Sequence, residues 1–349
     1  MISTSQIPLR SSVSIIVPIY NSQETLKATL DSLVEQSLKN IEIICVNDGS
    51  TDNSGKILNE YYKRCPQIKI VNTENQGPFS ARSKGIELAH GEYIGFCDAD
   101  DTVDPRMYEK LYKVAHDSDS EMALCAFHRK SETNVLSTEM NRNIGEFNID
   151  CNSGWLISLN TAVWNKIIRA DIAKSHLELT LNPRISEDAL FLLSIYPNMK
   201  KISFLSEPLY NYHINNSNAM TSVSLSDIEV IIESWKEGRS YLIRESKESF
   251  LEIFDLAAFV HLGISIPLVL IKSNSKEFKS CSRLLNKALD SCFPKYKKSR
   301  FFSLNYILKN RSFMLLPFFA YLSKKEHLLM PLLKIYNQIT LKLGKDLKW

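Results

Sequence analysis

Short apolar runs alternate with segments of helical hydrophobic spacing through the first hundred residues. Four runs rich in β-branched residues predict strands at 13–17, 41–47, 68–72 and 93–97. Helices are predicted between them, at about 22–36, 54–65 and 77–91, the first capped by Asn21 or Ser22. Because these strands are mainly apolar rather than alternating, the pattern indicates a buried parallel sheet with helices on both faces.

The pattern changes after residue 128. Residues 128–154 are polar and aperiodic, which predicts a loop or an irregular β insertion. Helical spacing is predicted at 153–172 and again at 184–197, where Ser186 is the expected cap. The later elements are predicted as a strand at 201–205, a polar loop at 210–220, helices from about 222 to the end, and a basic linker at 293–300.

Composition adds limits to this picture. A hydrophobic content of 44% and a charged content of 23% are typical of a globular protein. The seven cysteines form no CxxC pair, which favours a reduced, cytoplasmic protein without a disulfide framework or a zinc site. No secretory signal is expected at the amino terminus. The longest apolar run, 256–271, is shorter than the roughly 20 residues of a membrane-spanning helix, so a buried core helix is expected.

Charge is distributed unevenly along the chain. Residues 272–349 hold 17 Lys and Arg against 4 Asp and Glu, so this segment carries +13. Because the whole chain carries only +3, residues 1–271 carry −10. Aromatic and aliphatic residues alternate with the basic ones from 301 onward, as in helices that lie at a membrane interface. A helical bundle or a dimer interface is the alternative, and no nucleic-acid-binding motif accompanies the charge.

Acidic residues follow two of the predicted strands, at the sheet edge where ligands of such folds bind. Asp98, Asp100 and Asp101 end the fourth strand, and this DxDD cluster suits Mg²⁺ or Mn²⁺. A solvated acidic turn is the alternative. Asp48 ends the second strand, where it would bind a base or ribose or else cap the next helix, a role that Asp52 would also serve.

Two later segments also carry candidate chemistry. Glu187 and Asp188 stand in the first turn of a predicted helix, where acids are common for dipole reasons alone. Residues 210–220 gather neutral donors that suit a phosphate or a sugar, with His213 as a partner for a diphosphate, unless they form a polar surface loop. No Walker A or GxGxxG sequence follows the first strand, which argues against P-loop phosphoryl transfer and hydride transfer.

The order of these segments is more specific than any one of them. VSIIVPIYNSQETLKATLDSLVEQS, IEIICVNDGSTDNS and NQGPFSARSKGIELAHGEYIGFCDADD closely resemble the nucleotide-sugar-binding half of inverting family 2 glycosyltransferases with the GT-A fold. VWNKIIR and ISEDALFL resemble the acceptor half of the bacterial surface-polysaccharide members. The resemblance implies a Rossmann-like, mostly parallel sheet flanked by helices, with a C-terminal helical extension. It divides the chain into a GT-A domain at 1–220 (donor half 11–101, acceptor half 102–220) and a helical, basic region at 221–349.

The resemblance also implies roles for individual residues. Asp188 would be the catalytic base, supported by Glu187, and Asp100 would ligate Mn²⁺ or Mg²⁺. The nucleotide sugar would contact Pro18, Tyr20, Glu24, Asp48, Asn75, Arg82, Asp98, Ala99 and Asp100. The acceptor or the diphosphate would contact Trp164, Lys166, His213 and Ser217. The family often has Ala-Arg-Asn where this chain has Ser83 after Arg82.

The implied reaction is transfer of one sugar, with inversion, from a UDP-hexose or UDP-N-acetylhexosamine to a hydroxyl of a lipid-linked glycan in capsule, O-antigen or exopolysaccharide synthesis. Neither a QxxRW motif nor transmembrane helices of the processive synthases were found. The expected location is the inner face of the cell membrane, through the basic region, and a homodimer is a further expectation. The alternatives are an inactive nucleotide-sugar-binding scaffold and a sugar nucleotidyltransferase, although the latter would have a Gly-rich, basic loop after the first strand.

Overall fold

The computed structural model forms two compact units, each with its own core. The residues it describes are 11–131, 134–140, 145–149, 153–157, 159–176, 178, 180, 183, 185–214, 223–273, 276–303, 305–306, 317, 319–324, 331–335 and 338. The first unit comprises Met1–Asn152, Asn160–Glu178 and Asn198–Asn216. The second comprises Ser153–Leu159, Leu179–Pro197 and Ser217–Trp349. The predicted division into a GT-A domain at 1–220 and a helical region at 221–349 stays a prediction.

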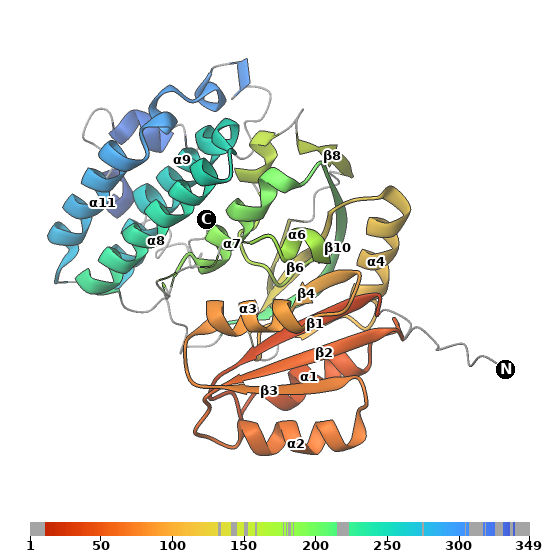
Figure 1. The fold of residues 1–349 in the computed structure, drawn as a ribbon. Helices are drawn as coiled ribbons and strands as arrows, with labels where there is room; N and C mark the ends of the chain where they lie inside the picture. Colours follow the sequence, from red (N-terminus) through yellow and green to blue (C-terminus); the bar gives the residue numbers. More distant parts are fainter. Residues whose placement is uncertain are drawn as a thin grey trace. The chain divides into compact units, whose positions relative to one another are not determined.

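A ten-stranded sheet forms the first unit (Figure 1). Its strands are β1 Val13–Ile19, β2 Ile41–Asp48, β3 Ile68–Thr73, β4 Tyr93–Phe96, β5 Thr102–Val103, β6 Met122–Lys130, β7 Val135–Glu139, β8 Glu146–Asn148, β9 Lys166–Arg169 and β10 Lys201–His213. Their order is β3-β2-β1-β4-β9-β6-β10-β5, with β7 paired to β6 and β8 to β10. The first four strands are parallel, as predicted, and β9 then joins β4 to β6 by antiparallel pairing.

Helices cover both faces of this sheet, which confirms the predicted α/β class. They are α1 Leu26–Val34, α2 Ser54–Arg64, α3 Pro78–Leu88, α4 Met107–Ser118 and α6 Ala170–Ala173. Alternate residues of β1, from Val13 to Ile19, share a buried cluster with α1, α2 and α4. Ile16 points to the other face, where α3 crosses β1 and β2 (Figure 1). A Cβ on Gly85 of α3 would lie 2.4 Å from Ile16, so the glycine permits this close packing.

Three predictions about local structure were wrong. The segment predicted as a helix at 153–172 contains the 3-10 turn η1 Ser153–Ile157, then β9 and the short α6. Its Ile167 and Ile168 are fully buried between β4 and β6, so sheet packing overrides the helical spacing. The predicted strand at 201–205 continues to His213, into the predicted loop. Helix α1 begins after Thr25, and Asn21, in a left-handed conformation, does not cap it.

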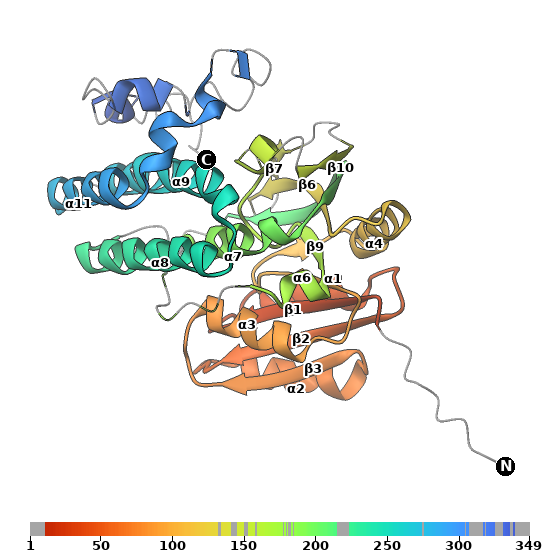
Figure 2. The same ribbon diagram turned by 45° about the horizontal axis from the view of Figure 1, so that its top comes forward.

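The second unit is helical. Its elements are α7 Glu187–Ile195, η2 Tyr196–Asn198, α8 Leu225–Arg244, η4 Glu248–Phe250, α9 Leu251–Val260, the π-helical η5 His261–Ser265, α10 Ile266–Lys272, α11 Phe278–Cys292, η6 Pro294–Lys298 and η7 Arg300–Phe302. Helix α8 packs against α9 and α11 (Figure 2). The predicted basic linker at 293–300 is wrong, because Phe293 and Tyr296 are buried in the core of this unit.

One continuous helical stretch of the second unit, Glu248–Lys272, is long and apolar enough to cross a membrane by length and composition. Within the structure, 83% of its most apolar window is buried. This agrees with the predicted buried core helix at 256–271.

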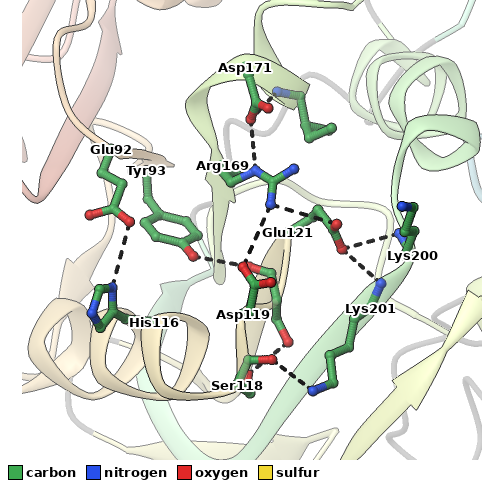
Figure 3. Close-up of polar contacts among 12 residues, drawn as sticks. Glu92, Tyr93, His116, Ser118, Asp119, Glu121, Arg169, Asp171, Lys200 and Lys201 are labelled. Carbon is green, nitrogen blue, oxygen red and sulfur yellow. Dashed lines mark hydrogen bonds and ion pairs between the residues drawn. The ribbon is translucent and has the colours of Figure 1, made fainter.

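A polar network lies at the end of the sheet where β4 begins (Figure 3). Glu121 is buried, and its carboxylate accepts hydrogen bonds from the backbone N–H groups of Lys200 (3.1 Å) and Lys201 (2.8 Å). Arg169 lies 3.7 Å from Glu121 and 2.9 Å from Asp171. Because Arg169 pairs with Tyr93, at the start of β4, this network lies at the opposite end of β4 from the acidic residues that follow it. Its role is therefore structural.

A second buried carboxylate at the same edge gives the fold a measurable pH dependence. Glu42 is 4% exposed and accepts hydrogen bonds from the Ser14 hydroxyl (2.5 Å) and the His90 N–H (2.7 Å). Burial alone would raise the pKa of Glu42, but the Lys69 ion pair and these hydrogen bonds lower it from its usual 4.5. Glu42 therefore stabilises the folded state above pH 4.5, and that stability is lost as the pH falls through the lowered folded pKa.

We expect Glu42→Gln to lower the free energy of unfolding at pH 7 by about 1–3 kcal/mol, since an ionised acceptor is lost from buried donors. The difference from the wild type should shrink as the pH falls below 4.5. Urea unfolding at a series of pH values measures both effects. Glu60→Gln, on the exposed face of α2, is the matched control. A difference that does not change with pH would contradict the assigned role of the charge.

Candidate active site

An acidic turn joins β4 to β5 in the first unit. It contains Asp98, Ala99, Asp100 and Asp101, and the Asp101 N–H closes it by donating to the Asp98 carbonyl (3.1 Å). Asp98 and Asp100 are partly exposed, whereas Asp101 is fully buried. Two of the three clustered carboxylates therefore reach the surface, at the carboxyl end of the parallel strands.

Helix α1 anchors the middle of this acidic turn. The hydroxyls of Thr25 and Thr29 both donate to the Ala99 carbonyl, at 2.8 and 3.0 Å. The two threonines stand one helical turn apart, so they meet the same acceptor. Ala99 is itself 6% exposed. It thus serves the site through its backbone.

Helix α3 supplies a cation to the same turn. The Arg82 guanidinium donates to Asp98 at 2.9 Å, and their side chains are 11% and 27% exposed. A partly buried pair of this kind is screened less by salt than a surface pair. The structure therefore brings together two residues that were predicted separately as nucleotide contacts.

Strand β10 holds the buried end of the turn. Asp101 accepts hydrogen bonds from the Tyr210 hydroxyl and from the His213 N–H, each at 2.7 Å. Burial raises the pKa of Asp101 well above its usual value, and the charges of Asp98 and Asp100 raise it further. The predicted polar loop at 210–220 thus begins as a sheet strand that positions the acidic cluster.

The His213 ring has a partner within the sheet. Its Nε2 lies 3.2 Å from the Thr102 hydroxyl on β5. Burial lowers the pKa of His213, and the charge of Lys130 lowers it further. The ring is therefore neutral near pH 7, and its contact with a diphosphate stays a prediction.

Asp48, at the end of β2, organises the loop that follows β3. It is 3% exposed and accepts hydrogen bonds from the N–H groups of Gln76 (3.0 Å) and Gly77 (2.8 Å). The Thr73 hydroxyl donates a third bond at 3.1 Å. Gly77, at φ +89°, provides the backbone turn into α3. Asp48 therefore fixes the exposed Asn75 loop, and its predicted contact with a base stays untested.

Two loops beyond β1 and β2 are cross-linked beside Asp48. The Asn21 N–H donates to the Ser50 hydroxyl (3.1 Å), and the Thr51 N–H donates back to Asn21 Oδ1 (2.8 Å). The Gln23 N–H donates to Asp52 (3.0 Å), which also accepts from the Ser54 N–H (2.9 Å) at the start of α2. These reciprocal bonds fix the backbone that presents three predicted nucleotide contacts, namely Pro18 (partly buried), Tyr20 (50% exposed) and Glu24 (exposed).

A buried lysine shapes the region around Trp164. The Lys166 ammonium is fully buried and donates to the carbonyls of Asn160 (2.8 Å) and Ala162 (2.5 Å) and to Asn165 Oδ1 (2.7 Å). These bonds fold the 160–165 segment, which carries Trp164. Lys166 thus stabilises the segment that carries Trp164. Its buried ammonium is not exposed for direct contact with a sugar.

The predicted catalytic acids lie in the second unit. Glu187 and Asp188 form the first turn of α7 and are partly exposed. Ser186 precedes them at φ +75° and makes no capping hydrogen bond, so the predicted cap is wrong. Ser217 lies outside the described residues. The roles of these residues stay predictions.

A metal would fit this acidic turn only together with its substrate. Within the described part of the chain, no group of three or more His, Cys, Asp or Glu side chains is arranged to hold a metal ion. Asp101 is committed to Tyr210 and His213, and Asp98 pairs with Arg82. Mg²⁺ commonly takes one or two carboxylates and completes its shell with waters and phosphates, which suits Asp100 and a bound diphosphate.

Comparison with known proteins decides the family of this site. The family described as Glycosyl transferase family 2 matches residues 14–175, which include the acidic turn, Asp48, Arg82 and Lys166. This chain carries a family 2 glycosyltransferase domain. The predicted family resemblance is confirmed.

Relatives of the family 2 domain are found among bacterial proteins. The chain is 34% identical over 218 residues to EpsJ, an uncharacterized glycosyltransferase of Bacillus subtilis, covering 60% of this chain and 63% of EpsJ. It is 29% identical to EpsH, a putative glycosyltransferase of the same organism, covering 72% of this chain and 75% of EpsH. The match therefore spans a little under two thirds of EpsJ.

A solved structure shares the fold of this chain. TarS residues 1–349 of S. aureus, in complex with UDP-GlcNAc, superpose with a TM-score of 0.70 at 20% identity. The superposition covers 90% of this chain and 92% of TarS 1–349. The predicted GT-A fold with a helical C-terminal part is thereby confirmed.

The residues that hold the acidic turn of the family 2 domain were not predicted from the sequence. Thr25 and Thr29 resembled ordinary positions of an amphipathic helix, and Tyr210 resembled a loop residue. Two signals were present in the sequence. The threonines have the i, i+4 spacing of one helix face, and Leu209, Tyr210 and Tyr212 continue the apolar character of the preceding strand.

Proposed function

We propose that this glycosyltransferase moves a single sugar, with inversion, from a UDP-hexose or UDP-N-acetylhexosamine to a hydroxyl of a glycan acceptor. The observation that carries the proposal is the acidic turn 98–101. In a family 2 domain, it lies at the ligand-binding edge of the sheet and is fixed by α1, α3 and β10. A turn held from three sides keeps Asp98 and Asp100 in place for a phosphorylated donor.

The donor assignment rests on three features. TarS, which shares the fold, has been crystallised with UDP-GlcNAc. In this chain, the half-exposed Tyr20 and the exposed Asn75 flank the Asp48 region and offer a ring and an amide to a uridine. Arg82, paired with Asp98, is a cation next to the proposed diphosphate position.

Each step of the reaction has a proposed residue. Asp188 takes the proton of the acceptor hydroxyl as that oxygen attacks the anomeric carbon, and Glu187 supports it. The bond from the anomeric carbon to the diphosphate breaks, and UDP leaves with the bonding electrons. Asp100 would hold Mn²⁺ or Mg²⁺, which when bound stabilises the charge that develops on the leaving diphosphate.

The acceptor is proposed to be a lipid-linked oligosaccharide at the inner face of the cell membrane, in capsule, O-antigen or exopolysaccharide synthesis. The basic segment 272–349 would be attracted to anionic lipids at about 1 kcal/mol for each nearby Lys or Arg. In the described part of this segment, four large apolar side chains are 39–56% exposed: Phe319, Leu322, Leu332 and Ile335. Basic and apolar surface together suit a membrane interface.

Donor choice is tested with the full chain and Mn²⁺ by a thermal-shift screen of nucleotide sugars, followed by mass spectrometry of a lipid-linked acceptor panel. A UDP-hexose or UDP-N-acetylhexosamine should raise the melting temperature, as a ligand at 100 times its Kd stabilises by about 2.7 kcal/mol. Stabilisation by sugars of another nucleotide, without any effect of UDP-sugars, would overturn the donor assignment.

Membrane association is tested by co-sedimentation with phosphatidylglycerol-rich vesicles. We expect the wild type to sediment and Leu332→Asp/Ile335→Asp to remain in solution. The control is Val135→Asp/Leu136→Asp on β7, because these side chains are 52% and 57% exposed, as much as Leu332 (45%) and Ile335 (50%). Equal loss of binding in both double variants, or no loss in either, would contradict a membrane contact through the C-terminal segment.

A further inference from the structure

Asp101 has a different environment from the other two acids of its cluster. It has no exposed surface, and one oxygen accepts from the Tyr210 hydroxyl while the other accepts from the His213 N–H, both at 2.7 Å. A metal ligand would have to give up these bonds and move toward the surface. We propose that Asp101 is a positioning residue that, through Tyr210, fixes Asp98 and Asp100 for the donor diphosphate; this inference rests on the proposed function.

The Tyr210 hydroxyl joins both ends of the acidic turn. It donates to Asp101 and accepts from the Asp98 N–H at 3.2 Å. The Asp101 N–H donates in turn to the Asp98 carbonyl at 3.1 Å. One hydroxyl from β10, more than a hundred residues away in sequence, thus closes the ring that contains Asp100. This ring holds the backbone that carries Asp100.

Tyr210 is itself rigidly held, as a positioning device requires. Its backbone pairs with Val103 on one side and Phe127 on the other. Its ring stacks on Trp164 at a centroid distance of 4.3 Å and an angle of 18°. Trp164 also meets Phe127 edge to face at 4.8 Å, and Lys166 folds the segment that carries Trp164.

Fold stability alone does not account for a carboxyl group at this position. Asp101 is fully buried beside two further carboxylates, and its two hydrogen-bond partners, Tyr210 and His213 N–H, are neutral donors. Burying such a group is costly, and even paired buried charges are weak sources of stability. We therefore expect this carboxyl group to serve the geometry of Asp98 and Asp100 and not the stability of the fold.

The test compares Asp101→Asn, Tyr210→Phe and the double variant. Asparagine keeps only one of the two acceptor oxygens, so either the Tyr210 hydroxyl or the His213 N–H faces an amide NH2 in place of an acceptor. Tyr210→Phe removes the hydroxyl itself. Both changes break a hydrogen bond of the network that holds the turn. The matched control is Tyr93→Phe, which also removes a buried hydroxyl, since Tyr93 donates to the Ser120 carbonyl (3.1 Å) at the other end of β4.

Two readouts are measured on the full chain. Hydrogen exchange of the peptide spanning 98–103, without any ligand, should accelerate in both single variants and stay unchanged in Tyr93→Phe. UDP affinity with Mn²⁺, by calorimetry, should fall by about 10- to 100-fold in each single variant. The double variant should bind UDP no more weakly than either single variant, because both substitutions disrupt the same hydrogen-bonded network.

Two results would overturn the proposal. One is unchanged exchange at 98–103 in both single variants, which tests the positioning role whether or not UDP binds. The other is additive losses of affinity with a raised Mn²⁺ requirement for Asp101→Asn alone, which would make Asp101 a direct ligand. Failure of the wild type to bind UDP while exchange responds as expected would instead contradict the proposed function and leave Asp101 as the residue that orders the turn.

Discussion

Asp188→Asn should reduce sugar transfer by about 10²- to 10⁴-fold while UDP binding remains within about twofold of the wild type. The amide keeps the size of the carboxylate and its place in the first turn of α7 but cannot accept the proton of the acceptor hydroxyl. Single-turnover transfer and calorimetry with UDP measure the two quantities separately. A loss of transfer without a loss of UDP affinity distinguishes a catalytic base from a residue that binds the donor.

The matched control for Asp188→Asn is Asp227→Asn. Asp227 lies in the first turn of α8, in the same unit, and forms a capping box with Ser224. Its replacement should cost about 1 kcal/mol of stability through the lost cap and leave turnover unchanged. Near-normal transfer by Asp188→Asn, or an equal loss in Asp227→Asn, would show that the base has been assigned wrongly.

Chelation by EDTA should abolish transfer, and added Mn²⁺ or Mg²⁺ should restore it. The described side chains form no metal site without substrate, so the ion should bind weakly to the free protein and more tightly when UDP is present. Asp100→Asn should therefore raise the Mn²⁺ concentration for half-maximal transfer by about tenfold or more, the loss expected for one ligand of a shared shell. Metal titrations of initial rate measure this shift.

Asp104→Asn is the control for Asp100→Asn. Asp104 stands four residues later, is partly exposed, and accepts from the Arg106 N–H (2.9 Å) ahead of α4. Its replacement should leave the metal requirement unchanged. Full activity of the wild type in excess chelator would contradict a role of Asp100 in holding a metal ion.

The first half of the fold was predictable because local and tertiary preferences agree there. Strands β1, β2 and β4 are mainly apolar and almost wholly buried, so their sequences indicate both structure and position, whereas β3, at the end of the strand order, is partly exposed. Around β9 the two preferences disagree. The segment 153–172 has helical spacing, yet Ile167 and Ile168 are recruited between β4 and β6, and only the tertiary partner determines that outcome.

The residues of the site likewise divide into those that the sequence predicts and those that depend on tertiary contacts. Asp98 and Asp100 were predictable from the acidic cluster that follows a strand, and Arg82 from the family resemblance, and the structure pairs Asp98 with Arg82. The burial of Asp101 was not, because it depends on Tyr210, whose strand β10 continues through residues with loop-like polarity. The family resemblance implied a contact of Lys166 with the acceptor or the diphosphate; in the structure its ammonium donates to Asn160 and Asn165 of its own segment, and the implied contact stays a prediction.

In the proposed reaction, release of UDP is coupled to glycosylation of an acceptor. The most direct measurement counts UDP released and sugar gained by the acceptor in one reaction, with the UDP-sugar selected by binding and with Mn²⁺ present. We expect one sugar on the acceptor for each UDP released, and almost no release in Asp188→Asn. Release of UDP that does not depend on acceptor, or binding of the UDP-sugar without any transfer across the acceptor panel, would contradict it.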